Sequence, residues 1–181
     1  MNDYGELLDE STVRFERLLP GPIDRVWSYL TESDKRAKWL CGGDIETSED
    51  GHVDMHFHNL SISQATKDDI PRPEKYKDMP EKMSFAGKVT RCEPKTLIEH
   101  TWEFDDENSL VLYELTEEGD KVRLVLTHRR LETSDIVLSV SGGWHTHLNV
   151  LEDVLAGDAL RPFYKMQTEY EAEYSQRLGL G

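Results

Sequence analysis

The chain has 181 residues, of which 37% are apolar and 31% charged, and its formal net charge at pH 7 is −15. This length predicts one domain with a substantial core, and the negative charge excludes a nucleic-acid partner and disfavours an anionic membrane surface. No apolar run is long enough for membrane insertion and the N-terminus has no apolar signal core, so we expect a cytoplasmic protein. Cys41 and Cys92 form no CxxC motif, and we expect two free thiols.

The first elements alternate between strand and helix patterns. Residues 1–11 are polar and predict a flexible N-terminus, ahead of a single domain over residues 12–181. The alternating segment 12–19 predicts a strand. Pro22 opens a helix with apolar residues at helical spacing, and a second short helix follows, with Ser33 as its N-cap and a glycine pair at 42–43 as its stop.

The stretch "GHVDMHFH", residues 51–58, holds three histidines and one aspartate and predicts a strand. Its apolar side chains, at positions 53, 55 and 57, alternate with the polar ones and should face the core, which places the histidines on the wet face. An HxH pair such as His56 and His58 can chelate zinc, but a third ligand cannot be identified. We therefore favour the wet face over a metal site, and a shift of register by one residue would reverse the faces.

Residues 61–82 hold three prolines and many charges, which predicts a long, functional or disordered connection. Four further strands are expected over 83–94, 96–104, 109–119 and 120–131. Their separators are short and turn-like, so neighbouring strands should be antiparallel.

The C-terminal part is helical. Apolar residues from Val137 to Leu155 form one stripe on a long helix, which Ser134 or Asp135 caps and Gly157 ends. Gly142 and Gly143 fall inside this pattern. Either the helix starts later, at residue 144, or the missing side chains let a strand or ligand come close, and the stripe favours the longer helix. Pro162 opens a last helix, with Phe163, Met166 and Tyr170 on one side.

These elements predict an α+β fold in which a curved antiparallel sheet of about six to seven strands wraps around the long C-terminal helix, with two short helices after the first strand. The segment "LLPGPIDRVWSYLTESDKRAKWL" resembles the start of START-like helix-grip (SRPBCC) domains. "GGWHTHLNVLEDVLAG" is similar to the long helix of bacterial members named after the activator of Hsp90 ATPase, and "LTHRRL" and "EPKTLIEHTW" fit the same pattern. The resemblance covers residues 12–178 and implies a cavity between sheet and helix.

The candidate cavity residues are aromatic, histidine and leucine side chains on the expected apolar faces. Polar groups among apolar ones orient ligands in pockets, which singles out His100, Tyr113 and His128, although core packing explains many such positions equally well. In "WHTHL", His147 lies at the edge of the apolar stripe while His145 points away, so the two cannot share a metal. The full set of candidates is Trp27, Trp39, Phe57, Phe85, His100, Trp102, Tyr113, His128, Trp144, His147, Leu148 and Leu151.

Three functions remain open. The favoured one is binding of a hydrophobic small molecule or lipid, gated by the connection at 61–82, with no cofactor and no metal. The second, which the resemblance implies, is a protein-interaction domain that activates a chaperone ATPase of the Hsp90 type, and it predicts an exposed apolar patch. The third is a cyclase or hydrolase of polyketide-type substrates in which His100, Tyr113 or His128 acts as acid or base. No GxSxG, P-loop or GxGxxG motif is present, so an enzyme is less favoured. The edge strands or the C-terminal helix could also support a homodimer, so the sequence leaves the oligomeric state open.

Overall fold

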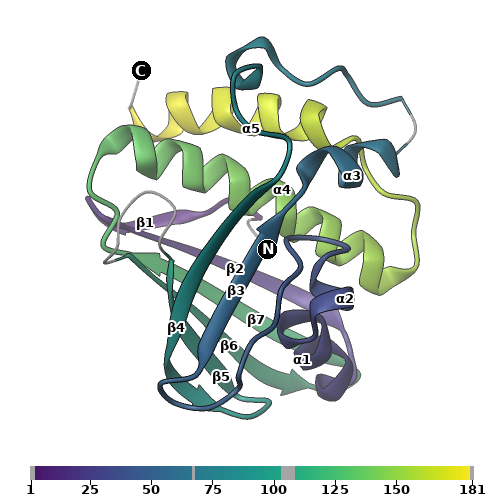
Figure 1. Ribbon diagram of the computed structural model, residues 1–181, viewed down its shortest axis with the longest axis vertical. Coiled ribbons are helices and arrows are strands. Elements are labelled where there is room, and N and C mark those ends of the chain that lie inside the picture. The colour runs from purple at the N-terminus through teal and green to yellow at the C-terminus, as the bar shows by residue number, and fades with distance from the viewer. Residues whose placement is uncertain (1–2, 67, 103–108, 180–181) are drawn as a thin grey trace.

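The computed structural model describes residues 3–66, 68–102 and 109–179. Within them, seven antiparallel strands form one curved sheet in the order β1-β2-β7-β6-β5-β4-β3, and one long helix lies against its concave face (Figure 1). The strands are β1 (Glu6–Asp9), β2 (Thr12–Pro20), β3 (His52–Phe57), β4 (Met83–Glu93), β5 (Leu97–Trp102), β6 (Ser109–Glu118) and β7 (Lys121–Arg129).

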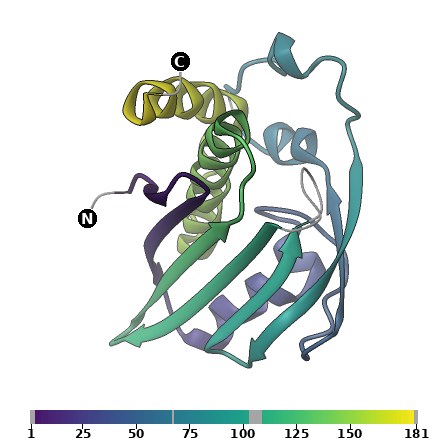
Figure 2. The same cartoon turned by 90° about the vertical axis from the view of Figure 1, so that its left-hand side faces the viewer.

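The helices divide into a short group and a long pair. The short ones are α1 (Ile23–Thr31), α2 (Ser33–Arg36), α3 (Asn59–Gln64) and the 3-10 helix η1 (Glu74–Tyr76). The long ones are α4 (Ser134–Ala156) and α5 (Phe163–Leu178). Figure 2 shows α4 lying in the hollow of the sheet. Helix α5 packs on the side of α4 that faces away from the sheet. The predicted α+β helix-grip architecture is confirmed.

The core lies between α4 and the concave face of the sheet. Alternate residues of β2, β6 and β7 are buried, as the period of two predicts. From α4, Leu148 and Leu151 enter this core and have no exposed surface. The apolar stripe of α4 and the apolar face of the sheet thus bury one another, which stabilises both.

Several local predictions need correction. The N-terminal segment contains β1, which pairs with β2, and the long connection begins with α3. Ser33 is the first residue of α2 and not its N-cap, and its hydroxyl accepts a hydrogen bond from Gly43 N at 2.9 Å. Thr133, not Ser134 or Asp135, caps α4, since its hydroxyl accepts from Ile136 N. The pairing of β1 and the Ser33–Gly43 contact depend on residues apart in sequence, whereas the Thr133 cap is local and one residue away from the predicted one.

The two ends of α4 are set by local sequence. The helix runs without a break through Gly142 and Gly143, so the prediction of the longer helix is confirmed. It ends at Gly157, which takes the left-handed conformation with φ of 74° that glycine adopts at low cost. In the described part of the chain, no helix is long and apolar enough to cross a membrane.

Candidate functional site

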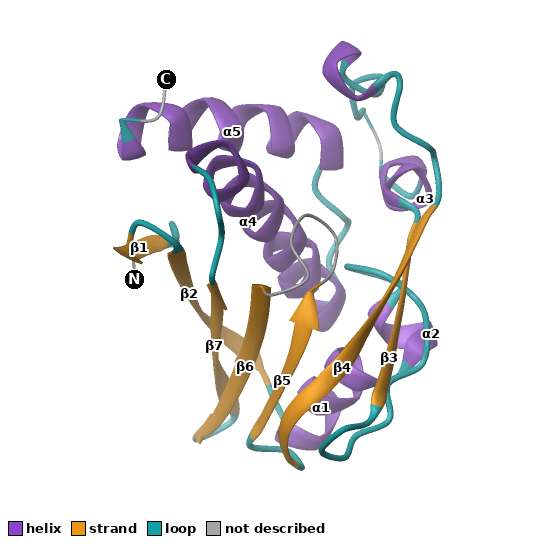
Figure 3. Ribbon diagram, turned by 60° about the vertical axis from the view of Figure 1, so that its left-hand side comes forward, coloured by secondary structure: helices purple, strands orange, loops and turns teal. Residues whose placement is uncertain are grey.

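A pocket of about 160 Å³ opens between α4, the β3–β4 side of the sheet and the segment that follows α3. We call residues 65–82 the strap; they join α3 to β4 and contain η1. Figure 3 shows α3 and the strap on the β3–β4 side, across from α4. The pocket is lined by Leu40, Phe57, Asn59, Arg72, Tyr76, Met79, Pro80, Glu81, Met83, Phe85, Trp102, His128, Ser139, Val140, Gly143, Trp144, His147, Tyr164 and Gln167.

Aromatic rings from the sheet and α4 form a continuous floor. The ring of Phe57 lies 5.6 Å from that of Phe85 and 5.7 Å from that of Trp102, measured between centroids. Trp102 in turn lies 5.2 Å from Trp144 of α4. Tilted and edge-to-face contacts of this kind stabilise aromatic clusters. The floor therefore offers flat, rigid apolar surfaces to a ligand.

His128 is buried beneath this floor, and both of its ring nitrogens have partners. The indole N–H of Trp144 donates to His128 Nδ1 at 3.0 Å. Because Nδ1 accepts, Nε2 carries the proton and donates to the Ser109 hydroxyl at 3.1 Å, which donates to the Trp102 carbonyl. Burial lowers the pKa of His128 to about 3, so the ring is neutral at pH 7. No lone pair of this histidine is left to act as a base.

His147 has one free ring nitrogen. Its Nδ1 donates to the Trp39 carbonyl at 2.6 Å, and burial lowers its pKa to about 4. The ring is therefore neutral at pH 7, with an acceptor lone pair on Nε2. No hydrogen-bond partner for Nε2 is present in the residues that the structure describes. A ligand in the pocket can supply one.

The strap forms the roof and is fastened to α5 at two places. The Asp69 carboxylate accepts from the backbone N–H groups of Tyr164 and Lys165, at 3.0 and 3.1 Å, as a capping side chain does at a helix start. Further along, Tyr76 and Lys75 both contact the Glu171 carboxylate. We call these contacts of Glu171 the latch.

The adjacent glycines of α4 have different surroundings. A Cβ atom at Gly142 would lie 2.6 Å from Glu171 Cγ, so the absence of a side chain lets α5 approach. A Cβ atom at Gly143 would meet nothing within 4 Å. Gly143 lines the pocket and lies one helical turn from Ser139 and His147, which also line it. The first glycine thus serves helix packing and the second leaves open space.

Two amide side chains of the pocket wall have unpaired oxygens. Asn59 Oδ1, at the start of α3, and Gln167 Oε1, on α5, are shielded from solvent and have no hydrogen-bond partner. A buried polar atom without a partner costs about 1–3 kcal/mol. Both side chains line the pocket, but these oxygens have almost no accessible surface within it.

A second, much smaller cavity of about 10 Å³ lies deeper, among residues that include Cys41, His100 and Tyr113. Burial lowers the pKa of His100 to about 4, raises that of Cys41 to about 11 and also raises that of Tyr113. His100 Nδ1 donates to the Thr101 carbonyl at 2.8 Å. These groups are neutral at pH 7 and belong to the packed interior.

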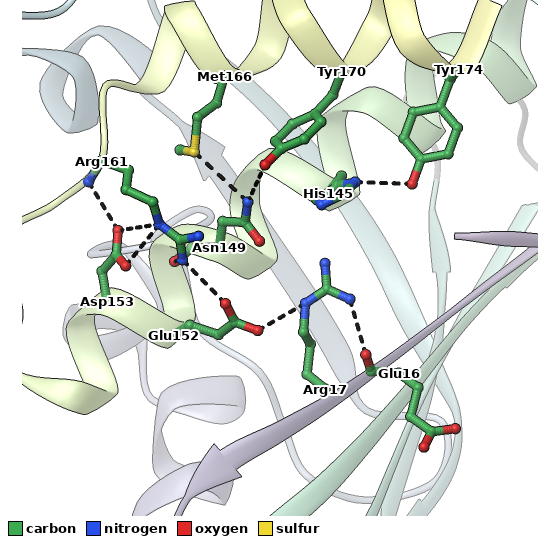
Figure 4. A network of polar contacts seen from close by, with 10 residues as sticks. All are labelled: Glu16, Arg17, His145, Asn149, Glu152, Asp153, Arg161, Met166, Tyr170 and Tyr174. Carbon is green, nitrogen blue, oxygen red and sulfur yellow. Dashed lines mark hydrogen bonds and ion pairs between the residues drawn. The ribbon is translucent and has the colours of Figure 1, made fainter. Parts of the chain in front are cut away.

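The opposite side of α4 is joined to β2 and α5 by polar contacts (Figure 4). Arg17 of β2, whose side chain is 1% exposed, pairs with Glu152 at 3.0 Å, and Glu152 also pairs with Arg161. Arg161 further binds Asp153 at 2.9 Å. His145 lies here, stacked on Tyr170 at 3.7 Å, and so points away from the pocket as expected, but it is buried under α5. This network fixes α4 between its two neighbours.

The predicted site residues separate into three groups. The pocket brings together Phe57, Phe85, Trp102, His128, Trp144 and His147, and the small cavity holds His100 and Tyr113 beside Trp102. Trp39, Leu148 and Leu151 are core residues outside the pocket lining, and Trp27 packs against the core half-buried. The sequence pattern places these side chains on the apolar faces of their elements. It does not show which part of such a face lines the pocket and which part packs in the core.

Sequence reasoning missed the residues of the roof, among them Arg72, Tyr76, Tyr164 and Gln167. The length and prolines of the strap suggested a functional segment but no particular side chain. Tyr164 and Gln167 are three residues apart and so share a face of α5, which is the only sequence signal for them.

The alternation of "GHVDMHFH" is as predicted. Val53 and Met55 are buried while His52 and His56 are exposed. His52 bonds to Asp54 at 3.0 Å and His56 to Ser84 at 2.9 Å. Within residues 3–66, 68–102 and 109–179, no group of three His, Cys, Asp or Glu side chains could hold a metal ion.

Comparisons with known proteins agree with this fold. The chain is 40% identical to the protein encoded by gene BPP1335 of Bordetella parapertussis, whose solution structure matches with a TM-score of 0.80 over 97% of this chain and 91% of that one. The conserved protein EF2215 of Enterococcus faecalis, whose function is unknown, shares the fold at 19% identity and a TM-score of 0.70, over 98% and 90% of the two chains. CalU16 of Micromonospora echinospora shares it at 18% identity and a TM-score of 0.65, over 93% and 88%.

The comparison with curated proteins gave no match. The family model of the activator of Hsp90 ATPase homolog 1-like proteins matches residues 20–156, from the end of β2 to the end of α4. This range holds strands β3 to β7 and the long helix α4, the larger part of the helix grip. The chain therefore belongs to the family of activator of Hsp90 ATPase homolog 1-like proteins, within the START-like helix-grip superfamily.

Proposed function

We propose that this protein binds a small, largely apolar molecule in the pocket between α4, the β3–β4 side of the sheet and the strap. The observation that carries the proposal is the open space beside Gly143, above a floor of aromatic rings. At about 160 Å³ the space is smaller than the roughly 300–1,000 Å³ of drug-sized sites. We infer a ligand of one or two fused rings, or a lipid segment of similar bulk.

The alternatives receive less support. A chaperone-activating interaction domain predicts an exposed apolar patch, but the large apolar side chains exposed in the described residues are Leu8 and Ile70, which are single. A cyclase or hydrolase needs an acid or base with a free position. Both nitrogens of His128 have partners, and His100 and Tyr113 lie outside the pocket, in the packed interior. His147 has a free Nε2, but burial lowers its pKa to about 4, which makes it a weak base. The proposal therefore assigns no catalytic residue.

A side chain added at Gly143 tests the proposal. Leucine there should occupy the open space and weaken the binding of naphthalene, measured by isothermal titration calorimetry, by more than about tenfold. Its folding should not suffer, because leucine has the higher helix propensity and meets no atom within 4 Å at Cβ. Gly143→Ala is the matched control, with the same helix but most of the space left.

Two results would contradict the proposal. One is an absence of naphthalene binding to the wild-type protein at the solubility limit. The other is equal binding by the wild type and by Gly143→Leu, which would place the ligand elsewhere. Thermal unfolding of each variant excludes misfolding as the cause.

A further inference from the structure

A surface cavity of about 510 Å³ adjoins the pocket, between the strap, α4 and α5. Leu138 of α4 and Thr168 of α5 contribute to its walls. Among the described residues, Tyr76 and Ser139 line both this cavity and the pocket. Since serine has a small side chain, the ring of Tyr76 is the larger part of the wall between the two spaces.

The latch holds the ring of Tyr76 in this wall. The Tyr76 hydroxyl donates to the Glu171 carboxylate, and burial raises its pKa to about 12, so the donor stays protonated at pH 7. Lys75 Nζ contacts the same carboxylate and lies 4.7 Å from the centre of the Tyr76 ring, within reach of a cation–π contact. Glu171 in turn lies close against α4, because Gly142 has no side chain in its way. The position of the ring is therefore set by contacts with both long helices.

This wall bears on the size of the ligand that the pocket can take. The pocket alone, at about 160 Å³, suits one or two fused rings, whereas the two spaces joined would take a longer molecule. Resting on the proposed function, we propose that Tyr76 limits the length of the ligand, because its ring closes the pocket toward the surface cavity. Binding sites can reject an unwanted partner by a clash as well as select a wanted one by contacts. A shorter side chain at position 76 should therefore admit ligands that the wild-type protein excludes.

The test compares naphthalene with N-phenyl-1-naphthylamine, which is naphthalene with one further ring attached. Isothermal titration calorimetry measures the dissociation constant of the first at pH 7, and fluorescence measures that of the second. The ratio of the second constant to the first is the readout, so a general loss of affinity cancels. Tyr76→Ala should lower this ratio by more than about tenfold, because the added ring gains an apolar space to enter. Tyr76→Leu repeats the test with a smaller loss of packing.

Tyr76→Phe is the matched control for the ring. It keeps the aromatic side chain and removes the hydroxyl group that binds Glu171. Its ratio should stay within about threefold of the wild-type ratio, because the ring still lies between the two spaces.

A second variant shows where the added ring lies. Ala172 is exposed and lines the surface cavity but not the pocket, so a larger side chain there fills the cavity at little cost to the fold. Ala172→Phe alone should leave naphthalene binding unchanged. Combined with Tyr76→Ala it should cancel the gain for N-phenyl-1-naphthylamine, because phenylalanine takes the space that the added ring would enter.

The outcomes separate this inference from the proposed function. If naphthalene binds but Tyr76→Ala leaves the ratio unchanged, or if the wild type binds the larger probe at least as tightly, Tyr76 sets no limit and the proposed function stands. An equal gain in Tyr76→Phe would assign the limit to the hydroxyl contact, and a gain that survives Ala172→Phe would place the added ring elsewhere. Either result overturns the inference. If naphthalene does not bind the wild type, the proposed function itself fails.

Discussion

Gly142 and Gly143 occupy adjacent positions of α4, and each leaves room for a different neighbour. Gly142 packs against Glu171 of α5, whereas Gly143 faces open space. A side chain added at Gly142 would disturb the contact with α5, whereas one added at Gly143 would change only the helix propensity. Substitutions at the two positions therefore measure these two effects separately.

We expect Gly142→Ala to lower the free energy of unfolding by about 1–3 kcal/mol, because its Cβ would overlap Glu171 Cγ. Gly143→Ala should raise it by about 1 kcal/mol, since alanine loses less conformational entropy in a helix. Urea denaturation of the two variants measures both values. Equal stabilities for the two variants would show that α5 does not depend on the close approach.

At the residue scale, the sequence predicted on which face of a strand or helix a side chain lies. It did not predict which residues that side chain contacts. The period of two in "GHVDMHFH" placed Val53 and Met55 inside and the histidines outside, because a strand allows only two directions. Trp39 and Trp144 could not be separated in this way. Both are buried, yet one packs in the core and the other in the pocket wall, a difference set by tertiary packing.

Among the elements, the strap has the least regular structure of its own and depends most on side-chain contacts. The latch joins Tyr76 and Lys75 to Glu171, and Asp69 holds the start of α5. Tyr76 also lines both the pocket and a neighbouring surface cavity, so its side chain lies between the two spaces. We expect opening of the latch to free Tyr76, which lines the pocket, and so to widen the way in.

Glu171→Gln should therefore loosen the strap, because the amide lacks the charge that attracts Lys75. We expect faster tryptic cleavage after Lys75 and Lys77 and faster exchange of bound naphthalene, with the rest of the digestion pattern unchanged. Glu173→Gln is the control: it removes the same charge from α5 but pairs only with Arg177 in the described residues. Identical cleavage and exchange rates in the two variants would argue against a latch.

Element types and order were largely predictable from sequence, since the periods of strands and of α4 are set locally. The strand β1 and helix α3 were not. These elements have only four and six residues, too few to show a period, and β1 pairs with β2 while α3 lies next to α5. The roof of the pocket could not be predicted because it combines segments about 100 residues apart, such as Asp69 and Tyr164.

For the whole molecule, four buried histidines predict how stability depends on pH. Burial, the largest cause for each, lowers the pKa of His100 and His147 to about 4 and of His128 and His145 to about 3. In the unfolded chain these groups titrate near 6.5, so below that pH the unfolded state binds more protons than the folded state. The contribution of these histidines to the free energy of unfolding is thus fully present above pH 6.5 and is lost as the pH falls toward 4.

Each histidine contributes up to about 1.4 kcal/mol of this loss per pH unit. Urea denaturation at pH 7.5, 6.5, 5.5 and 4.5 measures the decline. Protonation of carboxylates also reduces the net charge of −15 and its repulsion, which acts in the opposite direction. Repeating the series in about 0.5 M salt screens that repulsion. A stability that stays level from pH 6.5 to 4.5 in salt would mean that these histidines titrate in the folded state.

The division of the pocket into a floor and a roof bears on how such proteins diversify. The floor belongs to the sheet and α4, whose side chains also hold the fold together, so substitutions there carry a cost in stability. The roof comes mainly from the strap and one face of α5, and the strap adds no residue to the buried hydrophobic core of the described chain. Exchanges in the strap can therefore reshape the pocket at little cost to the core, so if the proposed binding holds, the strap is the segment to vary in order to change its specificity.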